Sequence, residues 1–438
     1  MSGSAAALAE RLGRLPAPPG PFRPRFWRSP IRGPWLTSVF GLVLLLGIPV
    51  LFVTGALSYA AYNPDLDPLN DQTPDKGVLG FYLFDWPTDP SWLYRLTQGV
   101  HVTLGVVLVP VLLAKLWSVI PKLFEWPPAR SAAHALERLS LLMLVGGAVF
   151  EFATGILNIQ LHYVFPGSFY TLHFYGAWVF IAAFAVHVAL RLGRMVRALR
   201  SRSLLVELRT GRTGTRPEPP DADGLVAPEP APPTIARRGA LALVGSGSLA
   251  LLVVTAGQSI GGRLRGTALL APHNRDRDSG PNGFQVNKTA AAVGVTAAMV
   301  GPDWRLELHG SGPGRVFTRE QLLALPQRSA RLPIACVEGW STEDQHWSGL
   351  PLADLAALAG LPDAANVLVE SVQPPGPYTS VVLRGNQIRD PRSLLALRVN
   401  GAELSLDHGY PARIIVPANP GVNNTKWVGR LTFRTGPA

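Results

Sequence analysis

Long uncharged runs of apolar residues alternate with polar connections over the first 260 residues of the chain. The first run, "WLTSVFGLVLLLGIPVLFVTGALSYAA" at 35–61, contains no charged side chain. Because a helix rises about 1.5 Å per residue, about 20 residues cross the apolar core of a bilayer. This run therefore predicts a membrane-spanning helix. Further runs predict additional spans at about 96–120, 139–161, 169–190 and 239–260.

The pattern changes near residue 284, where short alternating runs replace the long apolar ones. The runs "WRLELHG", "NVLVESV", "TSVVLRG", "ARIIVPA" and "VGRLTF" are separated by Gly and Pro, which is typical of strands joined by turns. One helical stretch, Pro351–Leu361, interrupts them. We therefore predict a mainly β (α+β) globular domain at 284–438. The other predicted divisions are a tail at 1–33, a four-helix membrane domain at 34–200, a linker at 201–236, a fifth transmembrane helix at 237–260 and a linker at 261–283.

Composition and charge support this division. Hydrophobic residues make up 47% of the chain and charged residues only 16%, which favours a membrane protein. The net charge of +11 comes largely from arginines at 11–32 and 191–238, beside apolar segments. Basic flanks set membrane orientation, so we interpret the charge as topology and expect no nucleic-acid partner. The tail and the 201–236 linker are then cytoplasmic, the acidic connection at 63–90 lies outside, and the C-terminal domain is extracytoplasmic in a multi-pass bacterial membrane protein.

Three histidines lie inside the predicted spans, where polar side chains are costly. His101 and His173 each lie about five residues from the outer end of their spans, so they share one depth. Two imidazoles that face each other across a helical bundle suit a bis-histidine haem. The alternative is that each histidine forms a hydrogen bond between helices. His187, fourteen residues after His173, lies within about 40° of the same helix face and is a possible ligand of a second haem.

The histidine pattern resembles the b-type cytochrome subunits of membrane hydrogenases and formate dehydrogenases, and the haem-binding membrane partner of periplasmic molybdoenzymes. The first predicted span lacks the histidine that would face His187. The resemblance implies a haem b and a membrane quinone or quinol as electron partner. Arg237 and Arg238 precede the fifth apolar run and resemble a twin-arginine export signal. A stop-transfer helix with a basic flank is the alternative, and both interpretations put the next domain outside.

The single cysteine of the chain, Cys336, lies in "RLPIACVEGWS". A lone cysteine forms neither an intrachain disulfide nor a CxxC site. Three interpretations remain for it: a buried apolar residue, a reactive thiol, or a single thiolate ligand of a metal or cofactor.

Four motifs occur in order around and after this cysteine: "CVEGWS", "HWSGLPLADLAALAGL", "HGYPAR" and "NTKW". Together they resemble the sulfite-oxidase family of molybdenum enzymes, and within it the catalytic subunits of periplasmic methionine-sulfoxide reductases. The resemblance implies a Mo-molybdopterin cofactor in which Cys336 is the protein ligand of Mo and the catalytic residue. It also implies that Asn424, Thr425 and Lys426 cradle the pterin phosphate. The full set of implied cofactor-binding residues is Asn282, Asn287, Ser371, His408, Arg413, Asn424, Thr425 and Lys426.

The residues after Cys336 bear on the substrate. Glu338, Glu343 and Asp344 are acidic and few cations accompany them, which disfavours the sulfite anion. The resemblance then implies a reductase of S- or N-oxides such as methionine sulfoxide, free or within a protein, that takes electrons from a haem b and quinone pool. Two alternatives stay open. One is a sulfite-type dehydrogenase that donates electrons to the membrane, and the other is a cytochrome-only electron carrier with a degenerate C-terminal binding module.

Overall fold

The computed structural model describes residues 16–62, 84–128, 131–159, 169–221, 223–271, 280–375 and 378–436. Most of the predicted acidic connection at 63–90 lies outside these ranges. The chain divides into two compact units that alternate along the sequence. The first contains residues up to Phe52, Leu104–Ile156 and Leu172–Leu252, and the second contains Val53–Thr103, Leu157–Thr171 and Val253–Ala438. The divisions after Phe52, Thr103, Ile156 and Leu252 fall inside helices, so both units include pieces of the same helices.

The helical part of the chain agrees with the predicted apolar spans. Its helices are α2 (Pro34–Tyr62), α3 (Leu93–Val107), α4 (Val109–Leu123), α5 (Ala132–Asn158), α6 (Phe169–Arg200), α7 (Leu204–Arg209), α8 (Arg237–Thr255) and α9 (Gly257–Ile260). Within the described ranges, four helical stretches are long and apolar enough to cross a membrane: Pro34–Ala61, His134–Asn158, Leu172–Arg200 and Arg237–Ile260. The pair α3 and α4, bent by 41°, would make a fifth.

A shared apolar core holds the first unit together. Phe40, Leu44 and Ile48 of α2 pack with Leu112 of α4 and Phe180 of α6. Yet large apolar side chains also remain exposed on the same helices. Examples are Leu46, Leu190 and Leu243, which are 67%, 73% and 68% exposed. Helices that are apolar on all sides need an apolar surrounding, and a lipid bilayer supplies one.

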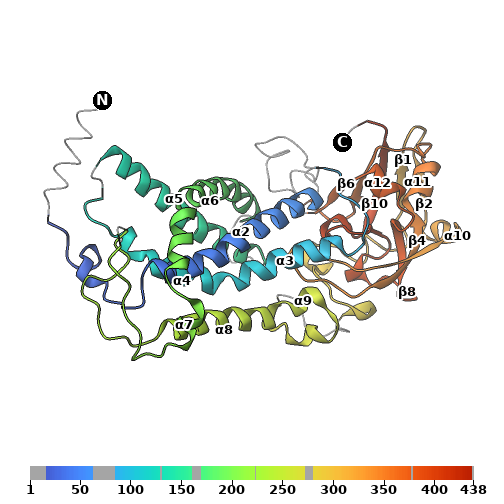
Figure 1. The fold of residues 1–438 in the computed structure, drawn as a ribbon. Coiled ribbons are helices and arrows are strands. Elements are labelled where there is room, and N and C mark those ends of the chain that lie inside the picture. Colours follow the sequence, from blue (N-terminus) through green and yellow to red (C-terminus); the bar gives the residue numbers. More distant parts are fainter. Residues whose placement is uncertain are drawn as a thin grey trace. The chain divides into compact units, whose positions relative to one another are not determined.

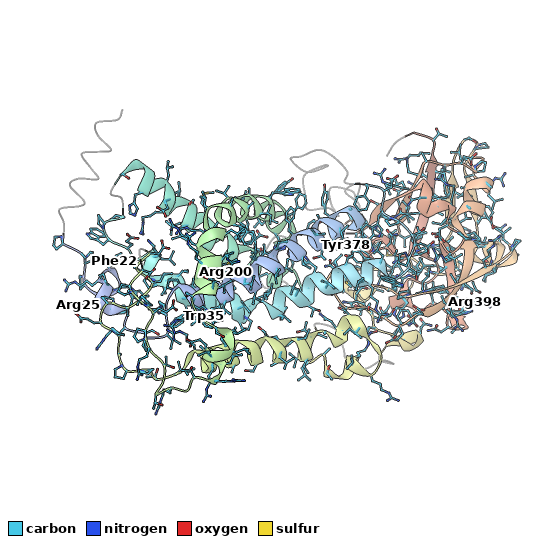
Figure 2. All side chains as sticks on the ribbon, viewed as in Figure 1. Phe22, Arg25, Trp35, Arg200, Tyr378 and Arg398 are labelled. Carbon is cyan, nitrogen blue, oxygen red and sulfur yellow. The ribbon has the colours of Figure 1, made fainter. Side chains whose placement is uncertain are left out.

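The segment predicted as a linker at 201–236 is tied to the helices around the buried Arg237. The Arg237 guanidinium lies 3.4 Å from the Glu207 carboxylate and 4.0 Å from that of Glu218. The backbone N–H of Trp35 donates to Glu218 at 3.0 Å. The indole of Trp35 donates to the Arg202 carbonyl at 3.1 Å, just past Arg200 at the end of α6 (Figure 2). Ion pairs with Arg237 and hydrogen bonds with Trp35 therefore attach residues 202–218 to α2 and α8.

The second unit contains two five-stranded sheets, which confirms the prediction of a mainly β C-terminal domain (Figure 1). The first has the order β2 (Arg315–Phe317), β1 (Leu306–His309), β10 (Val428–Arg434), β5 (Asn366–Ser371) and β6 (Ser380–Arg384). The second has the order β3 (Arg328–Leu332), β4 (Gln345–Pro351), β7 (Leu394–Val399) and β8 (Ala402–Glu403), with β9 (Arg413–Ile415) paired to β7. β1 and β10 run parallel, whereas the other strand pairs are antiparallel. Short helices α10 (Arg319–Ala324), α11 (Leu352–Leu358) and α12 (Gly385–Arg389) join the strands.

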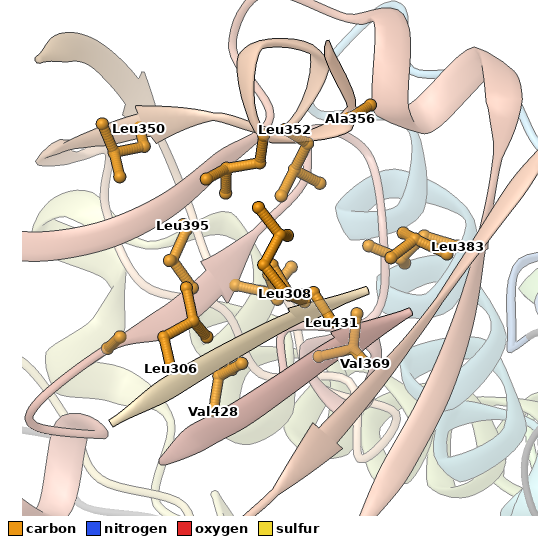
Figure 3. Close-up of a cluster of buried hydrophobic side chains, with 14 of the residues drawn as sticks. Leu306, Leu308, Leu350, Leu352, Ala356, Val369, Leu383, Leu395, Val428 and Leu431 are labelled. Carbon is orange, nitrogen blue, oxygen red and sulfur yellow. The ribbon is translucent and has the colours of Figure 1, made fainter. Parts of the chain in front are cut away.

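The core of these sheets follows from the alternation of residues along the strands. Leu306 and Leu308 of β1 are buried and meet Leu431 of β10 in the cluster of Figure 3. Glu307 between them points away from this core, and its carboxylate lies 2.7 Å from Arg430 on the neighbouring strand. The helix predicted at Pro351–Leu361 forms as α11 but is shorter, because Pro351 still belongs to β4 and Gly360 adopts a positive φ.

A segment distant in sequence completes the second unit. The Trp86 indole donates to the Ala418 carbonyl at 2.6 Å, and Asn386 donates to the Trp86 carbonyl at 2.8 Å. Arg392 pairs with Asp89 at 2.8 Å. Residues 84–92, directly before α3, are therefore part of the unit that holds the sheets.

The buried charges around Arg237 predict a difference between the two adjacent arginines. Arg237→Ala removes the ion pair of the buried Glu218 and leaves Glu207 paired with Arg202 alone, which should lower the free energy of unfolding by about 3–5 kcal/mol. The exposed Arg238→Ala is the matched control and should melt like wild type. Melting of the detergent-purified variants is the measurement, and equal melting temperatures for the two would contradict the assigned role of Arg237.

Candidate active site

Cys336 sits in a tight turn between β3 and β4 and is buried, with 4% of its surface exposed. Its backbone N–H donates to the Trp340 carbonyl at 2.8 Å, and the Gly339 N–H donates back to the Cys336 carbonyl at 3.0 Å. Gly339 adopts a φ of +89°, which favours glycine. Ala335 forms β-bridges with Ser341 and Pro420. The thiol is therefore held by backbone bonds on both sides.

The turn around Cys336 packs against α3 and α9. A Cβ on Gly339 would lie 2.7 Å from the Cβ of Val102, so only glycine lets the turn approach this closely. The Gln98 amide donates to the Val337 carbonyl, and the Ser341 N–H donates to the Gln258 carbonyl at 3.0 Å. Residues of α3 adjacent to His101 thus support the turn that carries the cysteine.

Burial and one acidic neighbour determine the chemistry of the free thiol. Burial raises the pKa of Cys336 well above its usual range, and the nearby Glu338 carboxylate raises it further. Glu338 Oε2 lies 3.6 Å from Cys336 Sγ and accepts the Trp340 indole N–H at 2.8 Å. The thiol is therefore protonated at neutral pH, and a thiolate here requires a nearby positive charge.

Two cations, Arg413 and Lys426, bind backbone carbonyls, and Lys426 interacts electrostatically with Cys336. Arg413, on β9, is buried and donates to the carbonyls of His408 and Asn424, both at 3.1 Å. Lys426 Nζ donates to the carbonyls of Lys288 and Asp407 at 2.6 and 2.9 Å. Burial, and then the charge of Arg413, lowers the pKa of Lys426 well below its usual range. Because these hydrogen bonds do not neutralise the cations, an anion bound beside them would stabilise both.

Two polar groups between Arg413 and Lys426 lack partners. The side-chain oxygen of Asn424 accepts the Val416 N–H at 2.8 Å, but its Nδ2 is buried without a hydrogen-bond partner among the described residues. The Thr425 hydroxyl is also buried without a hydrogen-bond partner among the described residues. Buried donors without partners are rare in proteins. These donors, beside two cations, fit the phosphate of a bound cofactor.

The remaining predicted cofactor residues have partners within the fold. His408 stacks on Phe284 with ring centroids 3.8 Å apart, and its Nδ1 lies 3.3 Å from the Asn282 side-chain oxygen. Asn287 accepts the N–H of Lys288 at 2.8 Å, and the Ser371 hydroxyl donates to the Trp427 carbonyl at 3.3 Å. Ser371 and His408 therefore neighbour the ends of the Asn424–Lys426 segment, whereas Asn282 ties its own segment to the residues before His408.

Lys288 is a site residue that the sequence analysis missed. Its ammonium lies 5.2 Å from the ring centroid of Tyr378, and it interacts electrostatically with the Glu338 carboxylate and with the thiolate form of Cys336. The only signal in the sequence was its position directly after Asn287. With Lys426 it brings two cations from distant loops toward Cys336, whereas the residues that follow Cys336 in sequence suggested an acidic surrounding.

The histidines of the apolar helices fall in different units. His101 on α3 belongs to the second unit, and its Nδ1 lies 3.1 Å from the Thr54 hydroxyl. His173 and His187 on α6 belong to the first unit. His173 Nδ1 lies 3.0 Å from the Thr154 hydroxyl and 3.2 Å from the Glu151 carboxylate. The charges of Lys115 and Arg191 act on His187.

The surroundings of His408 predict a pH dependence of stability. Burial lowers the pKa of His408 to about 3, so the folded chain keeps it neutral. The unfolded chain binds a proton near pH 6.5, so this contribution to stability is complete above pH 6.5 and decreases as the pH falls toward 3. We expect the free energy of unfolding to fall by about 2 kcal/mol between pH 7 and pH 5 in the wild-type chain. This part of the pH dependence should be absent in His408→Gln. The free energy of unfolding, determined at several pH values, is the measurement. The control is His309→Gln, because His309 is half-exposed. If the free energy of unfolding of His408→Gln depends on pH as in wild type, His408 is not the group responsible.

Comparison with known proteins covers the part of the chain that holds Cys336, Arg413 and Lys426. Residues 293–438 match the family model of the oxidoreductase molybdopterin binding domain. Mitochondrial sulfite oxidase of Drosophila melanogaster is 31% identical over 154 residues, which cover 30% of this chain and 27% of that protein. The uncharacterized oxidoreductase YuiH of Bacillus subtilis is 29% identical over 131 residues, 30% of this chain and 65% of the relative.

A third relative is the protein-methionine-sulfoxide reductase catalytic subunit MsrP of Gluconobacter oxydans. It is 34% identical over 146 residues, which cover 29% of this chain and 46% of MsrP. The chain thus spans less than two thirds of each of these relatives. Residues 293–438 therefore form a molybdopterin-binding oxidoreductase domain that is similar in sequence to sulfite oxidase and to MsrP.

Proposed function

We propose that this chain is a membrane-anchored molybdenum oxidoreductase that exchanges electrons between a haem b and quinone in the membrane and a substrate outside the cytoplasm. The observation that carries the proposal is the buried Cys336 thiol with the cations Lys288 and Lys426 in electrostatic range, inside the matched domain. The apolar helices support the membrane anchor, with a cytoplasmic N-terminus and an extracytoplasmic C-terminal domain.

Different site residues would hold different parts of Mo-molybdopterin, and this cofactor supplies the oxygen-atom and electron transfer chemistry. Cys336 would provide the thiolate. Its raised pKa favours a proton in the free protein, and the charge of a metal ion reverses that preference. Arg413 and Lys426, with the unpartnered donors of Asn424 and Thr425, would hold the phosphate. The backbone bonds of the Cys336 turn fix the thiol in place.

The surroundings of Cys336 support a neutral sulfur oxide as substrate. Glu338 lies 3.6 Å from Sγ and would repel an anion there. Reduction of a sulfoxide consumes two electrons and two protons, releases water and leaves the thioether. Methionine sulfoxide, free or within a protein, is therefore the substrate that we propose first, together with other S- and N-oxides.

A specific observation favours the second candidate, oxidation of sulfite with electrons passed to the membrane. Lys288 and Lys426 come from distant loops into electrostatic range of Cys336, and cations in that place suit an anionic substrate. In this reaction sulfite gains an oxygen atom from water and releases two electrons and two protons. Whether the negative charge of Glu338 or the positive charge of Lys288 and Lys426 dominates beside Cys336 decides between a neutral sulfoxide and the sulfite anion as substrate.

The membrane part of the proposal rests on His101 and His173, with His187 as a possible ligand of a second haem. A haem b transfers single electrons, and a quinone or quinol in the lipid is its usual partner. Val102, the residue after His101, lies against Gly339 of the cysteine turn. This contact supports electron exchange between α3 and the Mo site.

Cys336→Ser tests the molybdenum assignment. The variant loses the thiolate ligand, so turnover should fall by at least about 100-fold, while the haem spectrum stays unchanged. Metal content, absorption spectra and turnover of the purified full chain are the measurements. Ser329→Ala, exposed on β3 of the same domain, is the control. Full turnover in Cys336→Ser would contradict the molybdenum assignment, whereas haem without molybdenum in the wild-type chain would support a cytochrome-only carrier with a degenerate module.

The direction of electron flow is tested on the purified holoprotein. If the chain is a reductase, methionine sulfoxide should reoxidise chemically reduced haem, and sulfite should leave oxidised haem unchanged. Reduction of the haem by sulfite would establish the dehydrogenase instead. Cys336→Ser should abolish either response, because both pass through the Mo site.

A further inference from the structure

One arrangement of three residues occurs twice in the apolar helices. The sequence "TGAL" starts at Thr54 on α2, and "TGIL" starts at Thr154 on α5. In the second unit the first segment contacts His101, and in the first unit the second segment contacts His173. Each contact therefore lies within one unit.

The threonine is the first shared element. Thr54 Oγ1 lies 3.1 Å from His101 Nδ1, and Thr154 Oγ1 lies 3.0 Å from His173 Nδ1. The Thr154 hydroxyl donates its proton to the Phe150 carbonyl at 2.7 Å. It therefore accepts the hydrogen bond from His173 Nδ1, and the Glu151 carboxylate at 3.2 Å is a second acceptor for the same N–H. With the proton on Nδ1, Nε2 is the nitrogen suited to bind a metal.

The glycine is the second shared element. A Cβ on Gly55 would lie 3.1 Å from His101 Cε1, and a Cβ on Gly155 would lie 3.2 Å from His173 Cε1. Both distances are shorter than an ordinary contact between carbon atoms, which is about 3.5–4.0 Å. Glycine inside a helix costs about 1 kcal/mol relative to alanine. Here it makes room for an imidazole that lies against the backbone of the neighbouring helix.

His187 has a different environment. It lies on α6 as His173 does, but the groups that act on it are the cations Lys115 and Arg191. Lys115 Nζ in turn donates to the Thr37 carbonyl at 2.9 Å. Among the described residues, the threonine–glycine arrangement therefore distinguishes His101 and His173 from His187.

We propose that Thr54 and Thr154 are positioning residues that hold the Nδ1 of His101 and His173 so that Nε2 of each binds haem iron, with Gly55 and Gly155 admitting the two rings. The inference rests on the haem of the proposed function and adds to it the residues that orient the ligands. An acceptor on Nδ1 fixes the tautomer and makes the imidazole a stronger electron donor. This stabilises ferric haem and lowers its midpoint potential.

The test compares isosteric variants in the purified full chain. Thr54→Val and Thr154→Val remove the hydroxyl and keep the shape, so haem affinity should fall by about 10–100-fold and the midpoint potential should rise. The change should be smaller for Thr154→Val, because the Glu151 carboxylate remains as an acceptor for His173 Nδ1. Thr54→Ser and Thr154→Ser keep a hydroxyl and should restore both values. Thr103→Val, two residues from His101 on α3, is the control. Haem content, redox titration and the electron paramagnetic resonance spectrum of the ferric state are the measurements.

Additional variants separate this inference from the haem assignment. His101→Ala and His173→Ala should lose the haem spectrum. If haem binds to them as to wild type, the proposed haem site fails, and the inference fails with it. If the histidine variants lose haem while the valine variants keep the wild-type potential and spectrum, only the inference about the threonines fails. Gly55→Ala and Gly155→Ala should displace the rings and change the ferric spectrum, and an unchanged helical circular dichroism spectrum shows that each variant is folded.

Discussion

A thiol buried beside a carboxylate holds its proton strongly, and the local structure around Cys336 is organised by that constraint. Burial and Glu338 both act against the thiolate. The turn nevertheless fixes Sγ by backbone hydrogen bonds and by contact with α3. Such a residue is a poor free nucleophile but is well placed as a ligand, because a metal ion bound to Sγ favours the thiolate.

The same reasoning applies to the cations nearby. Arg413 and Lys426 direct their N–H groups at carbonyl oxygens, which orient them without neutralising their charge. Carboxylate partners would have produced stable ion pairs with no need of a ligand. Asn424 Nδ2 and the Thr425 hydroxyl, which lie between them, are likewise buried without a hydrogen-bond partner among the described residues. The fold has thus collected positive charge and free donors in one place where an anionic cofactor would complete them.

Several features could be predicted from the sequence because their signals are local. Alternating runs such as "WRLELHG" identified β1, and the ordered motifs around Cys336 and Lys426 identified the cofactor domain. β7 was not predicted as a strand from alternation, because Leu394–Leu397 are all buried and the run is continuously apolar. Lys288 and the Thr54–His101 contact could not be predicted, since they join residues whose distance in space only the fold sets.

The contacts of Trp86 have a consequence for the timing of synthesis. Its indole bonds to Ala418, a residue 332 positions later in the chain. During synthesis, the residues around Trp86 therefore leave the ribosome before Ala418 and the other partners of this segment have been made. The second unit closes only when the last strand leaves the ribosome, so its assembly follows translation and cannot keep pace with it.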